Sequence, residues 1–164
     1  MLKKNQIQII AEPGKQELFI IREFDAPREL VFQAFTDPEL VVQWMGPRNL
    51  SMKIDYYDAR DGGSWRYISS DPEGNEYAFR GVFHEIMAPE RAIQTFEFEM
   101  MKGHVVLDSA LFEPISGGHR TKLTIHSVYQ SLDDRDGMVQ SGMEGGLNDG
   151  YERLDEILAT QMKG

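Results

Sequence analysis

The sequence contains no cysteine among its 164 residues, and this absence excludes several kinds of chemistry. Without thiols the chain can form neither disulfides nor thiolate zinc or iron–sulfur sites, and it has no cysteine nucleophile. Basic residues are also scarce, because 17 Lys and Arg stand against 27 Asp and Glu and give a formal net charge of −10. Such a protein repels phosphate backbones, so we expect no nucleic-acid partner.

Long hydrophobic runs are lacking as well. No run approaches the ~20 apolar residues of a membrane span, and the segment after Lys3 and Lys4 is too short and too polar for the core of a signal peptide. We therefore expect a cytoplasmic protein without membrane insertion. The length predicts one domain, and 41% hydrophobic with 27% charged residues is ordinary globular composition.

Recognisable catalytic and metal-binding motifs are missing too. No serine lies in a Gly-x-Ser-x-Gly elbow, so we expect no catalytic residue of that type. No pair of histidines has the spacing of a metal site, and we expect neither a metal nor another cofactor. The four histidines are His84, His104, His119 and His126.

Three charged residues of the predicted strands could still anchor a polar group if they face inward: Arg66, Arg80 and Asp108. Side chains alternate between the two faces of a strand. Arg66 and Arg80 alternate with Trp65 and Phe79, so both arginines are predicted to face outward.

The N-terminal third predicts one strand and two short helices. Residues 1–16 form an extension with a possible edge strand at Gln6–Ile10, and residues 17–164 form the single domain. Leu18–Phe24 is predicted to be the first strand of this domain. A helix over residues 27–36 begins at a proline, and a second over 38–45 ends at a Gly-Pro pair.

From residue 49 onward the hydrophobic period changes to two, and Gly, Pro, Asn and Asp clusters divide the chain at short intervals. The connections are so short that consecutive strands must be antiparallel neighbours. An amphipathic helix follows at about 133–161. The six predicted strands lie near residues 49–59, 64–71, 76–87, 90–100, 104–114 and 119–129.

These elements predict an α+β fold, in which an antiparallel sheet of about seven strands curves around the long C-terminal helix. A flat sheet of that width would expose more apolar surface than one helix covers, whereas a curved one wraps around it. The two small helices fall between the first and second strands.

Seven segments of the chain resemble the START-like (SRPBCC, helix-grip) superfamily, in particular the branch named after the activator of the ninety-kilodalton heat-shock chaperone ATPase. The resemblance covers about residues 17–160. It implies a deep apolar cavity between sheet and helix, and roles that include lipid or hydrophobic-ligand binding, co-chaperone action and polyketide cyclisation. Family members usually have tryptophan where Leu147 stands. The segments are REFDAP (22–27), FTDPEL (35–40), QWMGP (43–47), DARDGGSW (58–65), GVFHEI (81–86), APER (88–91) and GMEGGL (142–147).

Aromatic side chains on three neighbouring strands are candidate walls of such a cavity, although aromatic residues also fill ordinary cores. Trp44 lies either at the rim of the cavity or between small helix and sheet as a plug. The candidate ligand-binding residues are Trp44, Trp65, Tyr67, Phe79, Phe96, Phe98, Met143, Leu147 and Tyr151.

The C-terminal helix contains several glycines in its first half. Each lowers helix stability by up to ~1 kcal/mol relative to alanine. Gly146 and Gly150 either let the helix approach the sheet closely or leave room and mobility beside a ligand.

The leading functional hypothesis is non-enzymatic binding of a small hydrophobic or amphipathic molecule. Two alternatives are an enzyme of polyketide cyclase or dehydratase type that uses the same cavity, and a co-chaperone-like interaction module with a chaperone or homodimer partner. Fold alone does not decide among them.

Overall fold

A computed structural model of the protein describes residues 5–163, and most of these belong to eight strands and four α-helices. Residues 1–4 of the predicted N-terminal extension lie outside the described residues. In chain order the elements are β1 (Gln8–Ile10), β2 (Glu17–Phe24), α1 (Arg28–Thr36), α2 (Pro38–Trp44), β3 (Ser51–Tyr57), β4 (Ser64–Ser70), β5 (Glu76–Met87), β6 (Arg91–Phe98), β7 (Val105–Ile115), β8 (Arg120–Tyr129), α3 (Leu132–Gln140) and α4 (Met143–Lys163).

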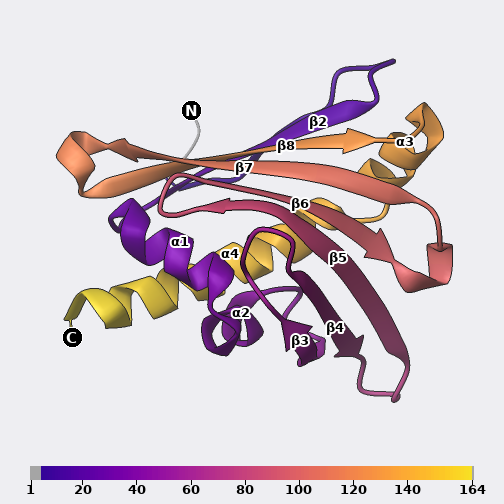
Figure 1. Cartoon of the computed structure of the whole chain (residues 1–164), viewed down its shortest axis with the longest axis horizontal. Coiled ribbons are helices and arrows are strands. Elements are labelled where there is room, and N and C mark those ends of the chain that lie inside the picture. Colours follow the sequence, from indigo (N-terminus) through magenta and orange to yellow (C-terminus); the bar gives the residue numbers. More distant parts are fainter. Residues whose placement is uncertain (1–4, 164) are drawn as a thin grey trace.

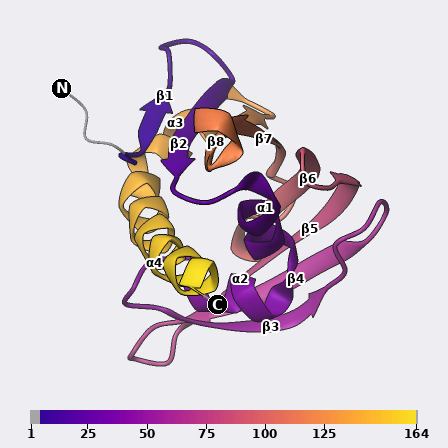
Figure 2. The same cartoon turned by 90° about the vertical axis from the view of Figure 1, so that its left-hand side faces the viewer.

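The strands form one antiparallel sheet in the order β1-β2-β8-β7-β6-β5-β4-β3. From β3 to β8 each strand pairs with the next along the chain, as the short connections require, and β2 joins the far side through β8. The sheet curves strongly, and α1, α2 and α4 lie within the curve (Figures 1 and 2). The predicted α+β fold of a curved sheet around a C-terminal helix is therefore confirmed.

Two details differ from the sequence prediction. The sheet has eight strands rather than about seven, because the possible edge strand is present as β1, with Ile9 opposite Ile20. The single helix predicted over 133–161 is two helices, since the chain breaks between α3 and α4. Gly142 has a φ of +85° there, a left-handed conformation that glycine adopts readily and that ends α3.

The main core occupies one end of the concave face, where α1 packs on β7 and β8. Phe32 of α1 meets Phe112 of β7 edge to face, with ring centroids 5.0 Å apart. Phe24, Phe112 and Leu123 are completely buried in this region. The apolar side chains at alternate positions of these strands thus form one continuous layer beneath α1.

A second cluster lies at the other end of the sheet, on β4 and β5. Its buried members are Trp65, Tyr67 and Phe83. Phe96 and Ile86 are partly buried and pack against both clusters, so they connect the two.

Helix α4 crosses the open side of the curve and approaches the other helices more closely than it approaches any strand (Figure 2). Its polar connection to the sheet is an ion pair between Asp155 and the buried Arg22 of β2. Among the described residues, no helix combines the length and apolar character needed to cross a lipid bilayer.

Candidate functional site

Side chains at the centre of the concave face keep solvent-accessible surface, whereas side chains at its periphery are buried. Ala110, Ile125 and Phe96 point inward from β7, β8 and β6 and remain partly exposed, whereas Phe112 and Leu123 on the same face are completely buried. An inward-facing side chain retains accessible surface only where a space of at least water size lies beside it. The helices opposite therefore do not completely cover the middle of the sheet.

The start of α4 and the end of α3 face this region. Met138, Met143 and Leu147 pack against the main core and are likewise only partly buried. They share this property with the strand residues opposite, so the partly exposed surface is apolar on both sides.

Most of the predicted cavity residues come together in one aromatic stack. Phe79 lies at its centre, with ring centroids 5.2 Å from Tyr67, 5.4 Å from Phe96 and 5.0 Å from Phe98. Trp65 stacks on Tyr67 at 5.4 Å. These five residues line one end of the concave face, as alternation along the strands predicted.

Tyr151 and Trp44 lie in the main core instead. Tyr151 meets Phe24 edge to face at 5.5 Å. Trp44 is 3% exposed, and its indole Nε1 donates a hydrogen bond to the Ala34 carbonyl oxygen at 2.9 Å. Trp44 therefore has the buried position of a plug, but it fills the junction of α1, α2 and α4 rather than a place between small helix and sheet.

Polar groups also face the centre of the concave side. Asp108 of β7 points inward, opposite Ser127 of β8, and the Ser127 hydroxyl donates a hydrogen bond of 2.5 Å to its carboxylate. Burial raises the pKa of Asp108 to about 6, and the Ser127 hydroxyl opposes this shift. Asp108 nevertheless keeps part of its surface accessible, so it borders the same space as Ala110.

We expect Asp108→Asn to stabilise the protein above pH 6 by about 1–3 kcal/mol. The folded-state pKa is raised, so ionisation of Asp108 destabilises the folded state fully above about pH 6 and not at all below the ordinary pKa of 3.8. The gain should therefore fade as the pH falls from 7.5 to 4. Urea unfolding of both proteins across this range measures it, and a gain independent of pH would contradict the assignment.

Both arginines of the predicted strands face outward, as alternation predicted. Arg66 binds both carboxylate oxygens of Glu99, at 2.7 and 3.1 Å. Arg80 binds Glu97 at 2.6 Å. Of the three candidate polar anchors, only Asp108 faces the concave side.

The two helix glycines have different surroundings. A Cβ on Gly150 would lie 2.9 Å from the Trp44 carbonyl oxygen, so this glycine permits close approach, but to the end of α2 rather than to the sheet. A Cβ on Gly146 would meet only the Cδ atom of Pro47, at an ordinary 3.7 Å. Gly150 thus serves packing, whereas a methyl group fits at Gly146 in ordinary contact with Pro47.

These surroundings predict opposite effects of alanine. Gly150→Ala should lower the free energy of unfolding by roughly 1–3 kcal/mol, because the added methyl overlaps backbone atoms. Gly146→Ala should raise it by up to ~1 kcal/mol, the difference in helix propensity. Thermal melts followed by circular dichroism distinguish the two, and a loss of stability in both variants would show that a methyl group does not fit at Gly146.

Gln94, Ser127 and Tyr129 are inward-facing polar residues that the sequence analysis did not select. Alternation carries a signal for all three, because Ser127 and Tyr129 have the parity of the buried Leu123 and Gln94 has the parity of Phe96 and Phe98. The register adds that Gln94 lies opposite Asp108. Within residues 5–163 no group of three or more acidic or histidine side chains is placed to hold a metal ion.

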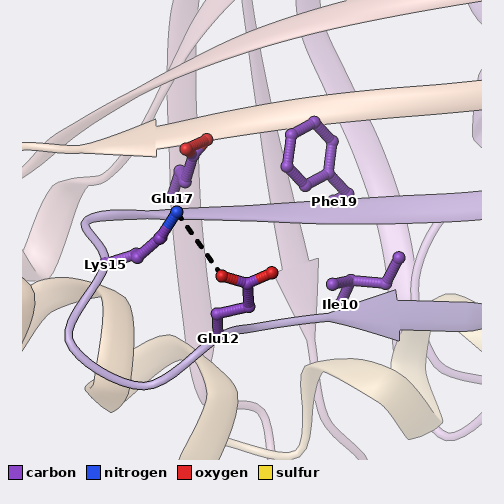
Figure 3. A pocket seen from close by; sticks show the side chains of 5 residues that line it. All are labelled: Ile10, Glu12, Lys15, Glu17 and Phe19. Carbon is purple, nitrogen blue, oxygen red and sulfur yellow. Dashed lines mark ion pairs between the residues drawn. The ribbon is translucent and has the colours of Figure 1, made fainter.

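A small hollow on the outer side of the β1–β2 hairpin is too small for a ligand. It measures about 40 Å³ and is lined by Ile10, Glu12, Lys15, Glu17 and Phe19 (Figure 3). The Lys15 ammonium turns back to the Glu12 carboxylate at 3.4 Å, and the space fits little more than one water molecule.

The outer face of the sheet is more apolar than a solvated face requires. Val128, Leu107 and Val82 are exposed, and the register places them in one row with Thr95 across β8, β7, β6 and β5. Beside this row lies an open hollow of about 360 Å³, which includes Arg80 and Thr95. The interaction-module hypothesis requires a surface of this kind.

The family model described as Activator of Hsp90 ATPase homolog 1-like protein matches residues 25–159. The chain belongs to this family. The match spans both small helices, six of the eight strands (β3 to β8), α3 and most of α4. The resemblance noted in the sequence segments is therefore confirmed. No curated relative matches the chain.

Solved structures of this fold are similar over almost the whole chain. A protein from Rhodobacter sphaeroides is 27% identical, with a TM-score of 0.86 over 94% of this chain and 99% of its own. A protein from Nitrosomonas europaea is 25% identical, with a TM-score of 0.78 over 93% of this chain and 100% of its own. DynU16, from the dynemicin biosynthetic locus, is 20% identical, with a TM-score of 0.67 over 90% of this chain and 49% of its own. It shares the fold.

Proposed function

We propose that the protein binds a small amphipathic molecule between the concave face of the sheet and the α3–α4 segment, without transforming it. The observation that carries this proposal is the partial exposure of Ala110, Ile125 and Phe96 in the middle of a face whose edges are buried. Ligand sites are concave and mostly apolar, with a few polar groups that fix orientation. Phe96 and Asp108 supply the two kinds of surface here.

The distance between α4 and the strands supports the same proposal. A helix packed directly on the sheet would bury Ala110, whose side chain is too small to reach across a gap. Leu147 of α4 packs against the main core and replaces the larger tryptophan usual in the family. This replacement leaves more room beside the sheet.

Filling the space should abolish binding. We expect Ala110→Leu to weaken the binding of Nile red, a neutral apolar fluorophore, by about tenfold or more, since the larger side chain occupies the volume that the ligand needs. The increase in fluorescence on titration measures the affinity. Stability should change little, because the added carbons enter unoccupied space.

Ala159→Leu is the matched control, since Ala159 is an exposed residue of α4 and receives the same substitution. It should leave the affinity unchanged. If Ala110→Leu instead destabilises the protein by roughly 1–3 kcal/mol, as overpacking does, the space is filled and the proposal fails. Unchanged Nile red affinity in Ala110→Leu would refute it equally.

Catalysis in the same space is a second candidate, favoured by Asp108. A carboxylic acid with a pKa near 6 can exchange protons close to neutral pH, as a general acid or base must. An enzyme of polyketide cyclase or dehydratase type would then lose turnover in Asp108→Asn and still bind its substrate. Retained turnover in this variant would exclude Asp108 as the acid or base.

A further inference from the structure

A row of polar residues crosses the concave face in register. Ser127 of β8 stands opposite Asp108 of β7, which stands opposite Gln94 of β6. The row is bounded by Leu18 of β2 and Phe83 of β5, which are 0% and 1% exposed. Three polar side chains therefore lie side by side within an apolar surround.

Most hydrogen-bonding capacity of this row is unused. Asp108 accepts a hydrogen bond from the Ser127 hydroxyl through Oδ1. Within residues 5–163, neither its second oxygen nor the Gln94 amide has a hydrogen-bond partner. In that part of the chain, every completely buried side-chain polar atom without a hydrogen-bond partner belongs to another residue. The second Asp108 oxygen and the Gln94 amide are therefore not completely covered by protein atoms. The hydroxyls of Tyr67, Tyr129 and Tyr151 likewise have no hydrogen-bond partner within residues 5–163 and are not completely covered.

The three tyrosines surround Asp108 from separate elements. They are 8%, 4% and 1% exposed in the order Tyr67, Tyr129 and Tyr151, and come from β4, β8 and α4. Burial and then the negative charge of Asp108 raise the pKa of each hydroxyl, which places all three within electrostatic reach of its carboxylate. Buried polar groups require partners, and no side chain or backbone group of residues 5–163 is hydrogen-bonded to these hydroxyls.

Among residues 5–163, no cationic side chain pairs with Asp108. Of the two buried arginines nearby, Arg22 binds both oxygens of Asp155, at 2.8 and 2.7 Å. Arg135 donates to Asp136 at 2.8 Å and to the backbone carbonyl oxygens of Glu12 and Glu17. Both guanidinium groups thus have partners, whereas an ionised carboxylate among apolar residues favours a positive partner.

We propose that the concave face binds an apolar primary amine, whose ammonium group is held by Asp108 with Gln94 and the tyrosine hydroxyls as additional acceptors. This inference rests on the proposed function and specifies its ligand class. The apolar part of the amine lies against Phe96, Ala110 and Leu147.

The available groups distinguish an amine from other amphipathic ligands. An ammonium offers three donors and no acceptor, and every partnerless group in the row can accept. Aromatic faces such as that of Phe96 also attract cations. A ligand carboxylate would meet the charge of Asp108 instead, and a net charge of −10 opposes its approach.

Three probes with one apolar body test the proposal by isothermal titration calorimetry at pH 8: 4-phenylbutylamine, 4-phenylbutanol and 4-phenylbutanoate. The amine should bind at least about tenfold more tightly than the alcohol, as a charged hydrogen bond provides, and the carboxylate most weakly. Asp108→Asn should remove the preference for the amine and leave the affinity for the alcohol nearly unchanged. Asp133→Asn, which removes an exposed charge from α3, is the matched control and should keep the preference.

The pH dependence gives a second test that needs no variant. As the pH falls from 8 to 5, Asp108 takes up a proton, so the amine should lose its advantage while the alcohol binds as before. The raised pKa values of Tyr67, Tyr129 and Tyr151 keep these hydroxyls neutral in this range. The guanidinium groups of Arg22 and Arg135 are bound to Asp155 and Asp136. An alkylamine, with a pKa near that of lysine at ~10.4, keeps its charge.

Equal or tighter binding of the carboxylate, or a preference for the amine that survives in Asp108→Asn, would overturn the proposal. A failure of all three probes would overturn it as well. If Nile red still binds in a manner sensitive to Ala110→Leu, the amine inference alone fails and the proposed function stands. If Nile red does not bind either, both fail.

Discussion

Replacement of Asp155 by alanine is expected to lower the free energy of unfolding by about 3–5 kcal/mol, because it leaves a charged guanidinium buried without its partner. Arg22 is 3% exposed, and both of its terminal nitrogens bind the Asp155 carboxylate. What would remain is one hydrogen bond to the Glu23 carbonyl oxygen and the ring of Phe24, 4.8 Å from the guanidinium carbon. Urea unfolding followed by circular dichroism at pH 7 measures the loss.

Glu156→Ala is the matched control on the same helix. Glu156 pairs with Arg48 at 3.5 Å, and both side chains are exposed, so this change should cost less than about 1 kcal/mol. A double variant, Arg22→Met with Asp155→Leu, should recover most of the loss, since well-packed apolar residues can replace a buried ion pair. If Asp155→Ala lowers the free energy of unfolding by less than about 1 kcal/mol, water replaces Asp155 as the hydrogen-bond partner of Arg22.

The strands were predictable because alternation and turn residues act locally. The two-residue period from 49 to 129 and the Gly, Pro, Asn and Asp clusters between its segments place β3 to β8 within a few residues of their observed bounds. The break at Gly142 was not predictable in the same way. Met143, Leu147 and Tyr151 continue the apolar period on its far side, and only the backbone conformation shows where one helix ends and the next begins.

The candidate site likewise has one part that the sequence predicts and one part that it does not. The aromatic stack around Phe79 follows from the alternation within each strand, so the sequence identifies its members. The row of Ser127, Asp108 and Gln94 depends on how three strands are aligned. That alignment is set by the register of β6, β7 and β8, which the spacing of turn residues does not specify.

Gly81→Ala is expected to lower the free energy of unfolding by about 3 kcal/mol or more, at the upper end of what overpacking causes. A Cβ at this position of β5 would lie 2.0 Å from the Thr95 carbonyl oxygen and 2.5 Å from the indole Nε1 of Trp65. The carbonyl belongs to the paired strand β6 and cannot move without disturbing the sheet. The indole is 5.4 Å from Tyr67 and 6.0 Å from Phe96 in the aromatic stack, so its displacement would disturb the candidate site too.

Gly137→Ala provides the control, because nothing lies within 4 Å of the Cβ that it adds to α3, and the better helix propensity should raise stability by up to ~1 kcal/mol. Urea unfolding gives the free energies, and tryptophan fluorescence of the folded Gly81→Ala protein reports the displacement of Trp65. The fluorescence should shift if the indole leaves its place over Gly81. An unchanged spectrum together with a loss below about 1 kcal/mol would mean that β5 and β6 separate easily here, and that Gly81 is not what holds Trp65 against the sheet.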